Sequence, residues 1–278
     1  MKRLFIIIVL LIIIVAWFPL HQTPSHDRAW VDSYERTPSA IVGTSTVTLQ
    51  NVRDWNHSTT SVLDRTWQDN VTIPVADIQS VWFGLSRFGE WDAVGHSYLS
   101  FELTDGSAYT LSIEARREEG QEYGAFTGLF NQFELWYGWG TERDFLGVSM
   151  FLLDRPLEYY QLDLTPAEAQ AVFVAVALET SRIADQPRFY NTLTANCTNL
   201  LAKAINDSYP DRIPYGIAWN LPGKSVPFLH KHRLIDQTIS IETHTKRATV
   251  DNDDPRLQES IETEPRAFSV ALREQLGE

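Results

Sequence analysis

The sequence contains one cysteine among its 278 residues, so it cannot form an internal disulfide bond. It also lacks a zinc-type spacing of cysteine and histidine, a glycine-rich phosphate loop and any internal repeat. Lysine and arginine number 23 against 36 acidic residues, without a basic stripe, which argues against a nucleic-acid partner. A hydrophobic content of 44% and a charged content of 21% exclude a disordered chain, a collagen-like repeat and a multi-span membrane protein.

A long apolar run stands near the start of the chain. It extends from Leu4 to Phe18, directly after Lys2 and Arg3. The run is long for the core of a cleaved signal peptide and slightly short for a full bilayer span. No small residues at A-x-A spacing follow it, which favours an uncleaved signal anchor over a cleaved signal. The two basic residues favour a cytoplasmic N-terminus, so we expect residues 1–20 to be a signal anchor with the remainder translocated.

Composition divides the rest of the chain into three parts. Residues 21–40 are polar and predict a flexible linker of about 25 Å. Residues 41–240 predict one α+β domain, an antiparallel sheet with packed helices, with most of the β pattern within 41–118. Residues 241–278 are polar, and we expect them to form a loosely held tail with one short helix at 266–276.

Two helices are predicted with defined starts. The first spans 165–185, because Thr165 is a suitable N-cap and Glu168 completes a capping box. The second begins near Asn196, carries apolar residues on one face and ends before Pro210.

The segment 95–116 predicts a β-hairpin, since apolar residues alternate along both of its halves. Placing every apolar side chain on one face pairs Leu103 with Tyr109. This register leaves a loop of three residues, 105–107, in which Gly106 can adopt a left-handed conformation.

The second face of the predicted hairpin carries titratable residues. The same register sets His96 opposite Arg116 and Tyr98 opposite Glu114. A solvated face with this composition is one interpretation. The other is a functional site, because a carboxylate beside an imidazole can orient it.

Cys197 stands at the expected start of the second helix, where Thr194 and Asn196 are candidate caps. Backbone N–H groups and the helix dipole favour a thiolate at such a position, and the same N–H groups can stabilise an oxyanion. A histidine within reach would complete a nucleophile and base pair. The alternative is a buried cysteine that acts as a small hydrophobe. Its polar neighbours, including Thr198 and Asn199, favour the nucleophile.

Four blocks of the sequence together resemble a known family. They are residues 95–101 (GHSYLSF), 112–120 (SIEARREEG), 142–144 (ERD) and 190–198 (YNTLTANCT). These blocks resemble the family named for the N-terminal periplasmic domain of the bacterial lipoprotein N-acyltransferase, over roughly residues 48–235.

The resemblance implies thiol-dependent acyl transfer in the periplasm. Together with the apolar run, it makes a bacterial inner membrane the expected location of the anchor, through residues 4–20. Carried over by position, Cys197 is the nucleophile, His96 the base and Glu114 a supporting catalytic residue. The order of histidine on a strand and cysteine on a later helix is also similar to permuted papain-like acyltransferases of the lecithin:retinol type. The polar 240–278 segment departs from the lipoprotein acyltransferases, which continue into a bundle of membrane spans, and this puts the lipoprotein substrate in doubt.

The candidate substrate-binding residues are Arg116, Tyr98 and Asn196. Arginines 116, 117 and 143 are candidates for a phosphate headgroup, although nearby acidic residues offer them ion-pair partners. Aromatic residues concentrate at 82–91 and 130–139, which is typical of a core and is also compatible with an acyl-chain groove or a lipid interface.

The sequence therefore predicts a membrane-anchored thiol acyltransferase or acyl hydrolase. The expected substrate is a phospholipid or a lipoprotein, and neither a cofactor nor a metal is expected. Two alternatives remain open: a cysteine peptidase or amidase acting on cell-wall peptides, and a non-catalytic envelope binding module.

Overall fold

The computed structural model describes residues 6, 22–89 and 91–277. The predicted signal anchor, apart from Ile6, lies outside the described residues. No helix in the described part of the chain is long and apolar enough to cross a bilayer.

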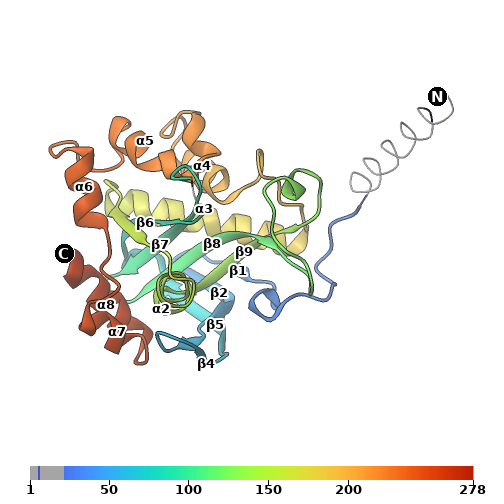
Figure 1. Ribbon diagram of the computed structural model, residues 1–278, viewed down its shortest axis with the longest axis horizontal. Helices are drawn as coiled ribbons and strands as arrows, with labels where there is room; N and C mark the ends of the chain where they lie inside the picture. Colours follow the sequence, from blue (N-terminus) through green and yellow to red (C-terminus); the bar gives the residue numbers. More distant parts are fainter. Residues whose placement is uncertain (1–5, 7–21, 90, 278) are drawn as a thin grey trace.

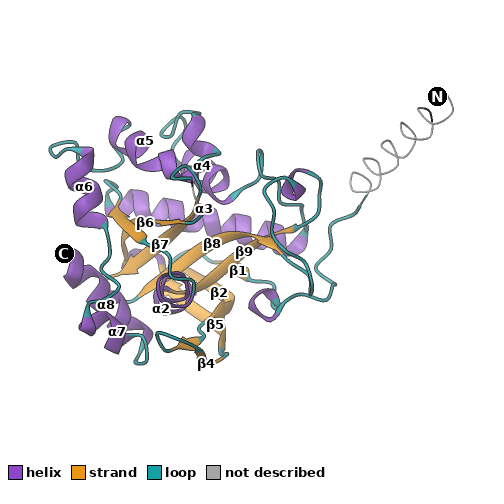
Figure 2. Ribbon diagram, viewed as in Figure 1, coloured by secondary structure: helices purple, strands orange, loops and turns teal. Residues whose placement is uncertain are grey.

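An eight-stranded sheet forms the centre of the molecule (Figures 1 and 2). Its strand order is β1-β2-β9-β8-β7-β6-β10, and β5 pairs with β2. The β2–β9 pair is parallel and the other pairs are antiparallel, so the sheet is mixed rather than purely antiparallel as predicted. The strands are β1 (Ser39–Val42), β2 (Thr46–Arg53), β5 (Trp67–Pro74), β6 (Ile78–Arg87), β7 (Gly95–Leu103), β8 (Ala108–Arg116), β9 (Glu134–Thr141) and β10 (Leu157–Gln161), with a separate pair β3 (Asn56–His57) and β4 (Val62–Asp64).

Helices cover both faces of this sheet, and because its pairs are mostly antiparallel the protein has the predicted α+β class. Helix α3 (Pro166–Asp185) packs on β1, β6 and β9, and α4 (Cys197–Ser208) packs on α3 and the β7–β8 hairpin. Helices α2 (Glu142–Gly147) and α8 (Pro265–Leu276) cover the other face, and in Figure 1 α2 lies in front of the sheet with α3 behind it. Each face has its own hydrophobic core because successive side chains of a strand point to opposite sides.

The two helices predicted from capping residues are confirmed. Thr165 and Glu168 form the expected capping box of α3, which spans Pro166–Asp185. Asn196 is the N-cap of α4, where it forms a second capping box with Asn199.

The β7–β8 hairpin exists, but its predicted register is wrong. Phe101 pairs with Tyr109, so each residue of β7 meets a partner two positions earlier than predicted. The turn is formed by residues 104–106: Leu103 N–H donates to Ser107 O at 2.8 Å, and Gly106, at φ 83°, donates to Leu103 O. A shift of two residues keeps every side chain on its face, so apolar alternation cannot distinguish the two registers. In the observed turn, Asp105 accepts hydrogen bonds from the N–H and the hydroxyl of Ser107.

The segment predicted to be a flexible linker packs on the body of the protein. Trp30 and Tyr34 are buried, and residues 39–42 form β1. The guanidinium of Arg116 donates to the carbonyl oxygen of Tyr34 at 2.6 and 2.9 Å and lies over the ring of Trp30. A polar composition does not reveal such bonds, because they depend on a partner distant in sequence.

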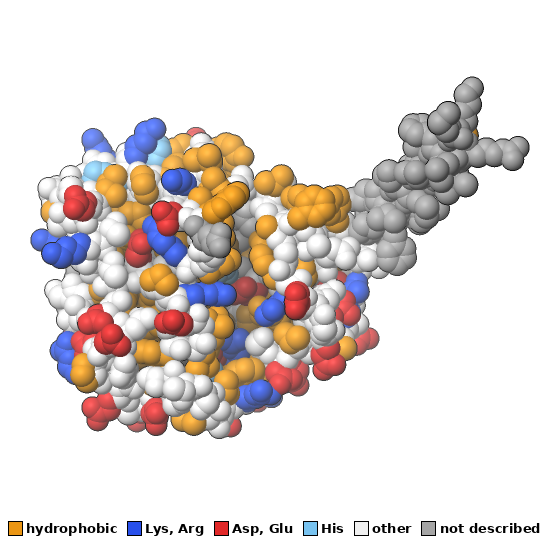
Figure 3. All heavy atoms as spheres, viewed as in Figure 1, with side chains coloured by type: hydrophobic (Ala, Val, Ile, Leu, Met, Phe, Trp, Pro, Cys, Tyr) orange, Lys and Arg blue, Asp and Glu red, His pale blue; other side chains and the backbone are white. Residues whose placement is uncertain are grey.

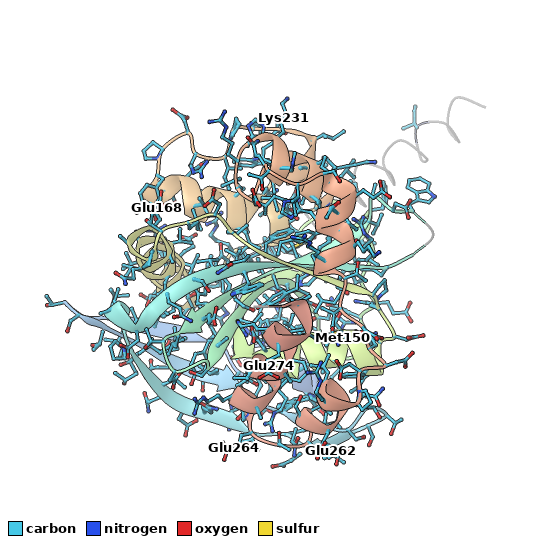
Figure 4. All side chains as sticks on the ribbon, turned by 90° about the vertical axis from the view of Figure 1, so that its left-hand side faces the viewer. Met150, Glu168, Lys231, Glu262, Glu264 and Glu274 are labelled. Carbon is cyan, nitrogen blue, oxygen red and sulfur yellow. The ribbon has the colours of Figure 1, made fainter. Side chains whose placement is uncertain are left out.

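The C-terminal tail is also held more firmly than predicted. It forms α6 (Ile241–Ala248), α7 (Pro255–Ser260) and α8, and Figure 4, in which Glu262, Glu264 and Glu274 are labelled, shows α7 and α8 against the body of the protein. Leu257, Phe268 and Leu272 are fully buried. Arg273 donates to both carboxylate oxygens of buried Glu142 at 2.8 and 2.9 Å. Helix α5 (Ser225–Lys231) lies between α4 and α6 along the chain.

Candidate active site

A cavity of about 430 Å³ contains the three residues predicted to be catalytic. Cys197, His96 and Glu114 all line it, together with Tyr98 and Ser112. The cysteine comes from α4 and the other four from the β7–β8 hairpin. The fold therefore brings together side chains that are separated by about one hundred positions in the sequence.

The cavity lies where β7 and β8 separate. The ladder between these strands ends at the Tyr98–Ser112 pair, although both strands continue beyond it. From that point Ser97 remains paired only to β6, and Ile113 only to β9. The separation frees the edge of β7, and the thiol of Cys197 receives a hydrogen bond from the backbone N–H of Ser97 there. The end of the ladder is thus what makes room for the start of α4.

The position of Cys197 is fixed by the capping of α4. Asn196 accepts a hydrogen bond from Asn199 N–H at 2.9 Å and donates to Thr192 O at 2.8 Å. Asn199 in turn accepts from Asn196 N–H at 2.9 Å. The first N–H groups of a helix have no partner within the helix, so those of Cys197 and Thr198 are not used by the hydrogen bonds of α4. The arrangement favours negative charge at this end of α4.

His96 is oriented by two oxygen atoms on β8. Its Nε2 lies 2.7 Å from Ser112 Oγ and 3.1 Å from Glu114 Oε1. The Ser112 hydroxyl donates to Glu114 Oε1 at 2.7 Å, so it links the imidazole to the carboxylate. Because these oxygens engage Nε2, Nδ1 is the nitrogen left for Cys197. The observed register produces this contact, since it places His96 at Glu114 and not at Arg116.

The three titratable groups favour a thiolate, an imidazolium and a carboxylate. Burial raises the pKa of the Cys197 thiol, but the charge of His96 and hydrogen bonds from His96 and Ser97 outweigh it and lower that pKa to about 7. Burial lowers the pKa of His96, but Glu114, Tyr98 and Cys197 together outweigh burial and hold this pKa well above its ordinary value of 6.5. Burial raises the pKa of Glu114, but the charge of His96 and hydrogen bonds from His96 and Ser112 lower it to about 2.

The residues predicted to bind substrate have different surroundings. Tyr98 lines the cavity, and its ring meets that of His96 edge-on with centroids 4.5 Å apart. Asn196 is buried, and the caps described above use its side chain. Arg116 is fully buried beneath Trp30 and is not among the residues that line the cavity. The two other arginines considered for a headgroup also differ: Arg117 lines the cavity, whereas Arg143 pairs with Asp54 at 2.8 Å.

Sequence reasoning missed several residues of this site. Ser112 stands two positions before Glu114 on the same strand face, a spacing from which its role was accessible. Arg53 lines the cavity from β2, and Arg155 lines it from the loop before β10. No local sequence motif predicts that either arginine belongs to the site. Among the described residues, no group of three or more His, Cys, Asp and Glu side chains is arranged to hold a metal ion.

A comparison with known protein families finds a match for this chain. Residues 64–219, more than half of the chain, match the family described as the Lnb N-terminal periplasmic domain, and they include Cys197, His96 and Glu114. No curated protein and no solved structure matches the chain. The family's name describes a periplasmic domain. On the strength of this match, the chain belongs to the family of the Lnb N-terminal periplasmic domain.

Proposed function

We propose that this protein is a periplasmic thiol acyltransferase or acyl hydrolase that acts on an envelope lipid or lipoprotein. The observation that carries the proposal is the shared cavity, in which a thiol of lowered pKa meets an imidazole held by Ser112 and Glu114. A nucleophile beside a base that is itself oriented by a third group is the arrangement of covalent acyl transfer. A cysteine opening a helix that packs on a histidine-bearing strand also supports a permuted papain-like architecture.

In the first half-reaction, the Cys197 thiolate attacks the carbonyl carbon of an ester. A carbon–sulfur bond forms and the carbonyl oxygen becomes an oxyanion, which the free N–H groups at the start of α4 are placed to stabilise. When the carbon–oxygen bond of the ester breaks, the His96 imidazolium gives its proton to the leaving alcohol oxygen. The products are an acyl thioester on Cys197 and neutral His96.

In the second half-reaction, an amine, an alcohol or water attacks the thioester. His96 takes the proton from this acceptor, the carbon–sulfur bond breaks, and the Cys197 thiolate returns. Glu114 remains ionised throughout and stabilises the imidazolium of the resting state. The acceptor decides whether the outcome is transfer or hydrolysis.

The lining of the cavity supports an acyl substrate. Apolar and aromatic side chains form much of its wall, namely Tyr34, Phe88, Trp136, Phe145, Val148 and Leu153. Tyr123 and Leu153 line the cavity and still expose 42% and 49% of their surface, so an apolar chain has a route outward. Figure 3 shows hydrophobic and basic side chains bordering a hollow near the middle of the visible face.

The sequence before the described body supports a site close to a membrane. The apolar run ends at Phe18, and Ser25 and His26 already contact the body, through the carboxylate of Glu134 and the carbonyl oxygen of Ile183. Seven or eight residues span at most about 28 Å. We propose that the apolar run holds the chain in the inner membrane, which would keep the cavity near the outer face of that bilayer.

The proposal is tested with the full-length protein in detergent and p-nitrophenyl esters of increasing chain length. We expect release of nitrophenol that Cys197→Ser abolishes, and an acyl mass on the peptide containing Cys197 that neutral hydroxylamine removes. A Cys197→Ser protein that retains full activity would exclude the mechanism. Release from peptide anilides or peptidoglycan fragments, but not from esters, would favour the peptidase alternative. An inert thiol and no hydrolysis of either substrate would favour a non-catalytic binding module.

A further inference from the structure

The charge of the cavity is opposite in sign to the charge of the chain. Acidic residues outnumber basic ones by 36 to 23 in the sequence. Among the described residues that line the cavity, however, Arg53, Arg117 and Arg155 stand against a single carboxylate, that of Glu114. The charge of His96, whose pKa is raised, is balanced by Glu114 at 3.1 Å. A concentration of positive charge in the cavity of an acidic protein favours the binding of an anionic ligand.

Two of these charged groups already have an ion-pair partner of opposite charge. Arg53 donates to both oxygens of Asp144 at 2.8 and 2.9 Å, so its charge is compensated from outside the cavity. Glu114 is occupied by His96 at 3.1 Å. The positive charge left over therefore belongs to Arg117 and Arg155.

These two arginines are held by aromatic rings and not by carboxylates. Arg117 lies over the ring of Tyr34 at 5.5 Å, and Arg155 lies over the ring of Phe88 at 4.7 Å. Within the described part of the chain, neither has an ion-pair partner. An aromatic face orients a guanidinium while leaving its charge and its N–H donors available. Both side chains are only partly exposed, which strengthens their attraction for an anion.

We propose that Arg117 and Arg155 form an anion subsite beside the Cys197 thiol, and that this subsite binds a phosphate group of the substrate. Arginine is suited to this task because its planar fork binds phosphate oxygens in pairs. The inference rests on the proposed function in taking this ligand to be the acyl donor, and it narrows that donor to a phosphate-bearing lipid. A cavity of about 430 Å³ accommodates a headgroup and the adjacent ester, with the acyl chain leaving past Leu153.

The first test compares two alkylating reagents that differ in charge. Anionic iodoacetate and neutral iodoacetamide attack the same thiol, so the ratio of their rates reports an anion subsite at Cys197. We expect Arg117→Gln and Arg155→Gln each to lower this ratio about fivefold, as loss of one close charge interaction predicts. Arg117→Lys and Arg155→Lys should retain part of the preference. The control is Arg256→Gln, whose side chain is 63% exposed and pairs with Asp254 in α7.

The second test uses phosphate compounds and identifies their source. We expect glycerol 3-phosphate to protect Cys197 from iodoacetamide in the wild type, and protection to weaken about fivefold in either Gln variant. Dihexanoyl phosphatidylglycerol that protects at lower concentration than glycerol 3-phosphate supports a lipid phosphate. Equal protection by both supports a free phosphate ester and overturns the lipid donor.

A third measurement keeps the inference independent of the thiol. In the Cys197→Ala protein, glycerol 3-phosphate at fixed ionic strength should raise the melting temperature, and it should not do so once Arg117→Gln is added. A thiol inert to both reagents would overturn the proposed function, while this rise in melting temperature would still support the subsite. The subsite would be overturned if the arginine substitutions left all three readouts unchanged. These are the ratio of the iodoacetate and iodoacetamide rates, the protection by glycerol 3-phosphate and the rise in melting temperature. This holds whether or not the thiol is reactive.

Discussion

Replacing His96 by alanine should change the ionisation of Cys197 more than any other substitution in the cavity. The imidazole is the main group that lowers the pKa of the thiol, and burial acts against it. Without His96, burial opposes the thiolate more strongly than the bonds from Ser97 favour it, so we expect the pKa to rise from about 7 to the ordinary value of 9 or above. Two pKa units correspond to about 2.7 kcal/mol of lost stabilisation of the thiolate.

The consequence is measurable without any substrate. At pH 7 the thiolate fraction should fall from about one half to about 1%. A thiolate of higher pKa is the better nucleophile, by about eightfold over two units, so the iodoacetamide rate at pH 7 should fall only about sixfold. The midpoint of the rate against pH is the cleaner readout, and we expect it to move upward by about two units.

The assay follows alkylation of the full-length protein across pH 5 to 10 by mass spectrometry. His232→Ala is the matched control, because it deletes an imidazole that is not among the residues lining the cavity. A wild-type midpoint near 9, or a His96→Ala midpoint within half a unit of the wild type, would refute the reasoning. Thermal melts of both variants exclude loss of the fold as the cause.

Three further predictions concern stability. The lowered pKa of Glu114 stabilises the fold at pH values above 4.5, the ordinary pKa of a glutamate, and this contribution is lost as the pH falls through about 2. The melting temperature of Glu114→Gln should therefore decline less steeply than that of the wild type between about pH 5 and pH 3. Arg273→Gln leaves the buried carboxylate of Glu142 without its ion-pair partner and should lower the free energy of unfolding in urea by about 3–5 kcal/mol. An unchanged unfolding midpoint would show that the C-terminal tail does not stabilise the fold. The control is the exposed Arg256→Gln, which should leave the midpoint unchanged. Asn196→Ala removes the cap of α4 and should cost about 1 kcal/mol in the same assay, so an equal loss at an uncapped position of α4 would contradict this role.

The site was partly accessible from the sequence because some of its determinants are local. An N-cap is a local signal, so the candidate caps Thr194 and Asn196 were enough to predict a helix start near Cys197, and the structure selects Asn196. Alternation over 95–116 likewise announces the hairpin that carries His96 and Glu114. The resemblance of four short blocks identified the family.

Other features were not accessible because they depend on which of several equivalent arrangements is formed. Two registers of the hairpin place the same residues on the same face, and only one brings Glu114 to His96. The polar 241–278 segment predicts a loose tail, yet Arg273 reaches a buried carboxylate more than one hundred positions away. A polar side chain shows that a partner is needed and does not show where that partner lies.

The sequence by itself determined the starts of α3 and α4, the hairpin, the α+β class and the single thiol, since each follows from the identity of residues that are close together along the chain. The tertiary structure alone decided that β7 and β8 separate beyond Tyr98 and Ser112, that Ser112 links His96 to Glu114, and that arginines from distant segments face the same cavity. The physical reason is that strand pairing and ion pairing are selected by contacts across the whole fold, and local propensity leaves those choices open.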